Sequence, residues 1–195
     1  TKNKIKKEKT FELNLDGIEK TKLLFYENMK QKEFDAKVLR IIDNKYVVLD
    51  QTCFYGRAGG QEPDTGYLGN SFVYDAEKMS GIIVHLVENP KFKEGESVHG
   101  KIDWEKRMQH AQHHTAIHII NGSARRVLGN HIWQAGAHKS MKKAHIDITH
   151  YRPLIEEEIE KIEKTANNIV KRKIKINKKI MERSKAEKEY GMRIY

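Results

Sequence analysis

The sequence has a single cysteine, three prolines among 195 residues, and no apolar run long enough to cross a membrane. With Cys53 as its one cysteine, the chain cannot form an intrachain disulfide. A membrane-spanning helix needs about 20 consecutive apolar residues, and the lysine-rich start also lacks the apolar core of a signal peptide. These absences exclude disulfide-stabilised secreted domains and integral membrane proteins, and we expect a cytoplasmic protein.

Negative charge is also scarce, because 27 acidic residues stand against 37 basic ones and the net charge is +10. Such a balance favours a polyanionic partner, since each phosphate that is neutralised releases counterions. A lysine-rich surface that is simply solvated gives the same balance, and charge does not separate RNA from DNA. Nucleic-acid binding is therefore one of two interpretations of the charge.

The first half of the chain has the pattern of short strands and turns. Residues 34–50 (FDAKVLRIIDNKYVVLD) contain two β-rich runs around Asp43 and Asn44, which predicts a hairpin. Further short strands are expected over 71–86, and residues 91–103 resemble the turn and strand of a small barrel. A turn-rich stretch over 54–70 contains five glycines: Gly56, Gly59, Gly60, Gly66 and Gly69.

Helical patterns begin at Asp103. This residue is suited to cap a helix that runs to about Leu128 and stops at Gly129. Pro153 marks the start of a second helix, with three glutamates where the helix dipole favours negative charge. The expected buried faces are Ala116, Ile117, Ile120, Ala124, Val127 and Leu128 in the first helix, and Ile155, Ile159, Ile162, Ala166 and Ile169 in the second.

The C-terminal residues predict a strand and a short helix. The run from Lys173 to Met181 (KIKINKKIM) has the period of two that is typical of strands. Ser184 and Glu187 have the spacing of a capping box for a helix ending before Gly191, and residues 192–195 (MRIY) look like the start of another strand. The whole order predicts an α+β fold: a small N-terminal β-barrel-like part followed by an antiparallel sheet packed with helices.

Two histidines in the first helix are candidates for a metal site. His114 and His118 are four residues apart, so both project from nearly the same side of a helix, about 40° apart. Zinc in proteins usually has further N, S or O ligands, so the pair alone indicates half a site or no site. Zinc proteases of this spacing carry glutamate after the first histidine, where this chain has Thr115, which disfavours proteolysis. His113 and His110 lie in or near the apolar stripe and are expected to pack or cap.

Three segments together resemble the editing domain of alanyl-tRNA synthetases and the related free-standing alanyl-tRNA editing proteins. They are VVLDQTCFYGRAGGQEPDTG, with its Thr-x-Phe-Tyr and Gly-Gly-Gln-x-x-Asp-Thr-Gly elements, HHTAIHIINGSARRVLGNHIWQAG, with its His-x-x-x-His, and AHIDITHYRPL. They occur in the family's order over about residues 25–195. Threonyl-tRNA synthetase has a related domain, but the Gly-Gly-Gln segment favours the alanyl family.

The resemblance implies hydrolysis of serine or glycine wrongly esterified to alanine tRNA. It also implies zinc held by His114 and His118 with a later Cys-x-x-x-His, which does not occur before Tyr195. We therefore expect residues 1–24 to be a linker and N-terminal extension, 25–102 a β-rich glycine-motif subdomain, and 103–195 an α/β editing core that is truncated before the second zinc-ligand motif. The parent would be a full synthetase that uses ATP and magnesium in a separate aminoacylation domain. The alternatives are a free-standing editing hydrolase and a metal-free tRNA-binding fragment that is inactive because its site is cut.

The resemblance also suggests roles for individual residues. Candidates to hydrogen-bond a serine hydroxyl are Thr52, Gln61 and Thr115, each of which could equally be a turn or helix-surface residue. Gly59 and Gly60 would let the backbone approach the substrate closely, or would simply form a hairpin turn. Arg125 and Arg126 could hold acceptor-stem phosphates, or be solvated charge. We expect residues 52–66 to form one wall of a cleft that faces His114 and His118.

Overall fold

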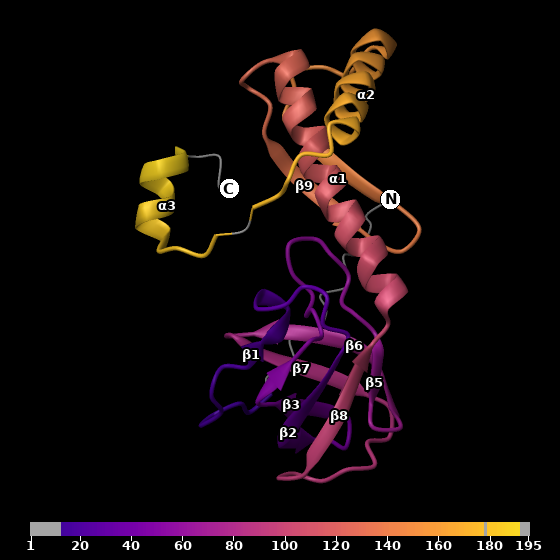
Figure 1. Cartoon of the computed structure of the whole chain (residues 1–195), viewed down its shortest axis with the longest axis vertical. Coiled ribbons are helices and arrows are strands. Elements are labelled where there is room, and N and C mark those ends of the chain that lie inside the picture. Colours follow the sequence, from indigo (N-terminus) through magenta and orange to yellow (C-terminus); the bar gives the residue numbers. More distant parts are fainter. Residues whose placement is uncertain (1–12, 178, 192–195) are drawn as a thin grey trace, which may run out of the picture.

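The computed structural model describes residues 13–177 and 179–191, which form a β-barrel joined to a smaller helix-and-hairpin part. The long helix α1 (Trp104–Leu128) leaves the barrel; the hairpin runs beside it, and a second helix packs against its far end (Figure 1). This arrangement confirms the expected α+β class with a barrel-like N-terminal part.

The barrel closes through six antiparallel strands in the order β2-β3-β7-β6-β5-β8. Asp43 and Asn44 have φ of 51° and 49° in the turn between β2 and β3, which confirms the predicted hairpin. Inward and outward side chains alternate along β8, as expected for a sheet with one buried face. The strands are β2 (Glu33–Ile42), β3 (Tyr46–Leu49), β5 (Gly66–Leu68), β6 (Ser71–Met79), β7 (Ile82–Val87) and β8 (Ser97–Ile102).

Branched aliphatic and aromatic side chains fill the barrel. Val38, Val47, Leu49 and Phe54 are fully buried there in one cluster. Gly100 lies against Phe34, and a Cβ at this glycine would come within 2.4 Å of the phenyl ring. The barrel interior is therefore packed to the point where one strand position tolerates no side chain.

The segment before the barrel packs on it. The short strand β1 (Lys22–Leu23) pairs in parallel with β4 (Gln51–Thr52), and Leu24 is buried in the barrel core. Leu13, Leu15 and Ile18 pack against a second cluster around Val48 and Val84. Packing on the barrel thus begins well before the expected boundary at residue 24; residues 1–12 lie outside the described part.

Helix α1 confirms the predicted caps. The Asp103 carboxylate accepts a hydrogen bond from the Lys106 amide at 3.0 Å, and Gly129 ends the helix with φ of 117°. Its buried face includes Ile117 and Ala124, but Ile120 is 37% exposed. The predicted apolar face is therefore correct in part, because the hairpin and second helix cover only one side of α1.

The hairpin β9 (Gln134–Lys139) and β10 (Ala144–Ile148) and the helix α2 (Glu156–Lys171) pack beside α1. Their shared core contains Ala124, Ile132 and Ile162. Helix α2 begins three residues after Pro153, and Ile155 and Ile159 in its predicted buried stripe are about half exposed. That part of the stripe was predicted wrongly, because only the face around Ile162 meets α1.

The predicted strand from Lys173 to Met181 is wrong for the described residues. Residues 174–177 and 179–182 have no regular structure, and Ile176 and Ile180 are exposed. A period of two forms a strand only beside a pairing partner, and none lies there among the described residues.

The short helix α3 (Arg183–Tyr190) exists, but Ser184 lies inside it and makes no cap. It stands away from both parts in Figure 1. The strand expected at 192–195 lies outside the described residues. Over residues 13–177 and 179–191, no helix is both long enough and apolar enough to cross a membrane.

Candidate functional site

The glycine-rich loop, residues 56–66, docks on the edge of β9. The Lys139 amide donates to the Gly60 carbonyl at 2.8 Å, and the Glu62 amide donates to the Lys139 carbonyl at 3.1 Å. Gly60 has φ of 70°, and a Cβ there would lie 2.0 Å from the Ala137 carbonyl oxygen. Only glycine satisfies both conditions, so the close approach expected of this position is made to the hairpin backbone.

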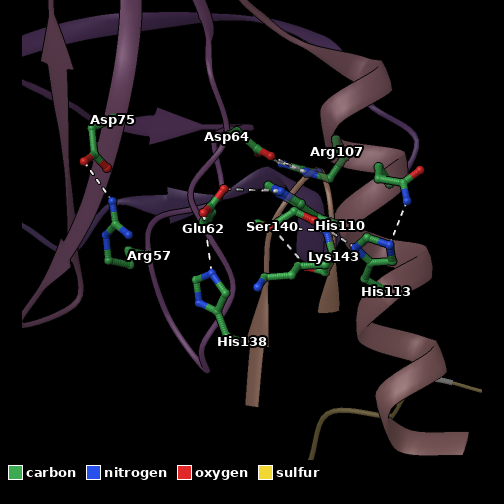
Figure 2. Close-up of polar contacts among 11 residues, drawn as sticks. Arg57, Glu62, Asp64, Asp75, Arg107, His110, His113, His138, Ser140 and Lys143 are labelled. Carbon is green, nitrogen blue, oxygen red and sulfur yellow. Dashed lines mark hydrogen bonds and ion pairs between the residues drawn. The ribbon is translucent and has the colours of Figure 1, made fainter. Parts of the chain in front are cut away.

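A buried ion pair ties the same loop to the start of α1. The Asp64 carboxylate is fully buried and accepts hydrogen bonds from Arg107 Nε at 3.0 and 3.1 Å, as Figure 2 shows. Arg107 also donates through Nη2 to Asp64 and to the Cys53 carbonyl, while the Tyr55 amide donates to Asp64 at 2.7 Å. The loop is thus fixed to α1 at one end and to β9 at the other.

The loop places Gln61 against the first histidine of the pair. Gln61 Oε1 lies 3.0 Å from His114 Nδ1, which therefore donates and leaves Nε2 as the free acceptor nitrogen. The His114 and His118 rings stack with centroids 5.1 Å apart. This contact confirms that the Gln61 part of the loop faces the histidine pair.

His114 is held in its neutral form. Partial burial lowers the pKa of His114, and the charges of Lys139 and His118 lower it further. A neutral imidazole with one nitrogen anchored and the other free can accept a proton, accept a hydrogen bond or bind a metal ion.

Lys139 is an unpredicted member of the site. Its side chain is buried, its ammonium donates to the Gly59 carbonyl at 2.7 Å, and burial lowers its pKa. Gly59 itself is exposed, with open space around its Cα. Lys139 therefore fastens the glycine turn and adds a positive charge close to His114.

A second set of polar groups lies around His110, which is one turn before His114 on α1 (Figure 2). Its other members are Glu62 of the glycine loop and His138 of β9. His110 is fully buried and neither of its ring nitrogens has a hydrogen-bond partner; Nε2 is 4.0 Å from a Glu62 carboxylate oxygen. The other Glu62 oxygen is 3.6 Å from His138 Nε2. Burial lowers the pKa of His110, so it too is held neutral.

The fourth histidine of this stretch has a structural role. His113 Nδ1 donates to the Ser140 carbonyl at 2.9 Å, and its Nε2 accepts from Gln109 at 2.7 Å. Both nitrogens are occupied, in keeping with the packing role expected for His113.

The structure does not bring Thr52 to this site. Thr52 is fully buried in the barrel, where its hydroxyl lies 2.9 Å from His85 Nε2 and accepts from the Phe54 amide. His85 Nδ1 donates to the Val47 carbonyl, so the Thr52 hydroxyl donates to the other ring nitrogen. Its place in this network is that of a barrel-core residue.

Thr115 and Arg125 also have partners of their own, and Arg126 is exposed. The Thr115 hydroxyl donates to the Ala111 carbonyl one turn back along α1. Arg125 and Arg126 lie near the far end of α1, and the Arg125 guanidinium is 4.2 Å from the centre of the Trp133 ring. Eleven residues of helix separate His114 from Arg125, about 16 Å along the axis, so the arginines lie away from the pair.

The residues offer zinc a partial fit. His114 has the orientation of a zinc ligand, because a neighbour holds Nδ1 and leaves Nε2 free. Within the described residues, however, no group of three or more histidine, cysteine, aspartate or glutamate side chains is arranged to hold a metal ion. Cys53 is buried in the barrel, and burial raises the pKa of its thiol to about 11, so it is no substitute ligand.

Comparison with known proteins identifies the family. Residues 1–106 match the family model described as tRNA synthetases class II (A). The chain is 46% identical over 179 residues to an alanine–tRNA ligase of Methanococcus maripaludis, covering 91% of the chain and 20% of the relative. It is 47% identical over 190 residues to that of Pyrococcus furiosus, covering 95% and 21%, and 47% identical over 182 residues to that of Pyrobaculum calidifontis, covering 91% and 20%. The chain thus spans about a fifth of the length of these relatives, and it belongs to the class II (A) tRNA synthetase family.

Proposed function

We propose that this chain is the editing part of an alanine–tRNA ligase, where it hydrolyses serine or glycine wrongly esterified to alanine tRNA. The contact between Gln61 and His114 carries the proposal. It joins the glycine loop to the histidine pair, the two motifs on which the resemblance to editing domains rests. An active site for alanine cannot fully exclude a smaller or slightly more polar amino acid, so a second, hydrolytic site is needed.

The side chains around His114 are suited to hold a small polar ester. Because Gln61 Oε1 accepts from His114, the amide nitrogen of Gln61 remains available to donate to a serine hydroxyl or to the ester carbonyl. Neutral His114 offers Nε2 as an acceptor. Water attacks the ester carbonyl, the bond to the ribose oxygen breaks, and the products are the free amino acid and the tRNA hydroxyl.

Zinc and tRNA are the implied cofactor and partner. His114 and His118 would supply two ligands, the remaining ligands would come from a Cys-x-x-x-His outside this sequence, and bound zinc would polarise or orient the ester. The net charge of +10 suits a tRNA partner. In the whole ligase, ATP and magnesium would serve a separate aminoacylation site.

Deacylation assays test the proposal. The whole ligase, with and without Gln61→Ala, is incubated with alanine tRNA charged with serine, glycine or alanine. We expect the wild type to release serine and glycine faster than alanine, and Gln61→Ala to lose at least tenfold in the serine rate. The control Gln112→Ala changes an exposed glutamine of α1, the helix that carries His114, and should match the wild type. Serylated tRNA that stays intact with the wild type, or a Gln61→Ala rate equal to the wild-type rate, would overturn the proposal.

A further inference from the structure

The far end of α1 carries a cluster of stacked rings and guanidinium groups. Arg125 lies 4.2 Å from the centre of the Trp133 ring. Beside it, His131 and His150 stack with centroids 5.1 Å apart and 22° between their planes, and Tyr151 lies 4.4 Å from His150. Tyr151 is 79% exposed and Trp133 36% exposed. We call Arg125, His131, Trp133, His150 and Tyr151 the stacking platform.

Hydrogen bonds hold the stacking platform in one piece. The Thr149 hydroxyl donates to the His131 carbonyl at 2.7 Å and accepts from the Trp133 amide at 2.9 Å. Between those two residues, Ile132 is buried in the core of the helical part, so its neighbours on either side face solvent. The two stacked histidines are also joined, with His131 Nε2 2.9 Å from His150 Nδ1. The rings are therefore preorganised on a buried anchor.

The surface next to the stacking platform is basic. A groove of about 600 Å³ is lined by Gly122, Arg125, Arg126, Gly129 and Asn130, none of them acidic. A Cβ at Gly122 would meet nothing within 4 Å, so the groove is open above the helix at that point. Open space, two guanidinium groups and flat rings together suit single-stranded nucleic acid, whose bases are planar and whose phosphates are negatively charged.

The stacking platform also lies in line with the histidine pair. Eleven residues of α-helix turn through about three full turns and 20°, so Arg125 projects from nearly the same side of α1 as His114. About 16 Å separates them along the axis. A strand whose end is held at His114 would therefore reach the stacking platform a few nucleotides away.

We propose that the stacking platform binds unpaired bases of the tRNA 3′ end, a few nucleotides before the esterified one. Bases stack on Trp133 and Tyr151, and Arg125 and Arg126 contact the adjoining phosphates. Aromatic faces and guanidinium planes are the usual means of holding single-stranded RNA without a fixed sequence. The proposal rests on the proposed function only in naming tRNA as the RNA.

Binding assays with the full 195-residue chain test it. The probes are an acceptor-stem minihelix with an unpaired 3′ overhang and the same duplex with a blunt end. We expect the overhang to increase affinity, and Trp133→Ala and Tyr151→Ala each to weaken overhang binding about tenfold while hardly changing blunt-end binding. Trp133→Phe should retain most of the affinity. Tyr67→Ala removes a ring that is 51% exposed on the barrel and should bind like the wild type.

Salt dependence separates stacking from charge. Trp133→Ala should leave the slope of log affinity against log salt unchanged, whereas Arg125→Ala should reduce it by about 1. Equal affinity of the wild type for both probes would overturn the proposal and point to a protein partner for this surface. Equal losses on both probes for a folded Trp133→Ala chain would also overturn it. Deacylation by the whole ligase is scored separately, so each proposal can fail while the other stands.

Discussion

Asp64 and Arg107 form a buried ion pair between residues 43 positions apart, one in the glycine loop and one in the first turns of α1. The carboxylate is fully buried and also accepts from the Tyr55 amide. Since a buried charge without its partner is costly, this pair makes the position of the loop dependent on α1. The same loop carries Gln61, so the contact between Gln61 and His114 depends on this ion pair.

Removing one member of this pair should therefore destabilise the protein strongly. We expect Arg107→Met to lower the free energy of unfolding by about 3–5 kcal/mol, because Asp64 would remain buried and unpaired. Urea unfolding followed by circular dichroism measures the change. Arg57→Met breaks the exposed Arg57–Asp75 pair, at 2.9 Å, and should cost at most about 1 kcal/mol. Similar losses for the two variants would contradict the importance given to burial.

Neighbouring glycines allow a matched test of the loop's approach to β9. Gly59→Ala places a side chain at φ of 57° in open space and should cost about 1–2 kcal/mol of unfolding free energy from backbone strain alone. Gly60→Ala adds a clash with the Ala137 carbonyl and should cost clearly more, with loss of loop docking. Thermal unfolding of both variants measures the difference. Equal costs would mean that the loop can lift from the hairpin freely.

Buried His85 should make stability depend on pH. Burial lowers the pKa of His85 from 6.5 to about 4, so below pH 6.5 the unfolded chain binds a proton that the folded chain excludes. Stability from this group is complete above pH 6.5 and falls as the pH drops towards 4, by about 3 kcal/mol in all. Urea unfolding at several pH values should show a shallower dependence for His85→Gln than for the wild type. Parallel profiles would rule out His85 as a source of this dependence.

Metal content tests the histidine pair. We expect the 195-residue chain to bind little zinc and the whole ligase to bind it stoichiometrically, because two imidazoles do not complete a zinc site. In the ligase, His114→Ala and His118→Ala should each release the metal. His113→Ala is the control, since both nitrogens of that ring are already bonded. Elemental analysis measures the zinc content of each variant. Zinc retained by both His114→Ala and His118→Ala would show that these histidines are not zinc ligands.

Binding of alanine tRNA should weaken steeply with salt. Phosphate contacts release counterions, so the logarithm of affinity should fall linearly with the logarithm of salt concentration, with a slope that counts the contacts. Filter binding at salt concentrations from about 50 to about 200 mM measures the slope. A flat response would argue against recognition through the RNA backbone.

Features encoded by neighbouring residues could be predicted from the sequence. The Asp103 cap, the stop at Gly129 and the turn at Asp43 and Asn44 each depend on the chemistry of a few adjacent residues. The strand expected at Lys173–Met181 failed because a strand also needs a partner, which local sequence does not specify.

The candidate site divides in the same way. The resemblance pointed to both Gln61 and His114, and the structure brings them together. Thr52 came from the same motif, yet its side chain is buried in the barrel, where its hydroxyl bonds to His85, a partner 33 residues away in the chain. Lys139 and Arg107 were missed because their partners lie 80 and 43 residues away in the chain. In the sequence, only Asp64 of the Asp-Thr-Gly element pointed to the ion pair with Arg107.

The two backbone hydrogen bonds between the glycine loop and Lys139 have a consequence for how this site tolerates mutation. They fix Gln61 on both sides through main-chain atoms, so replacing the Glu62 side chain by any residue other than proline leaves both bonds in place, whereas a side chain at Gly60 would clash with the Ala137 carbonyl. Saturation mutagenesis should therefore find Glu62 permissive and Gly60 nearly invariant. The position of Gln61 is therefore set by backbone hydrogen bonds, and these bonds depend on Gly60 having no side chain.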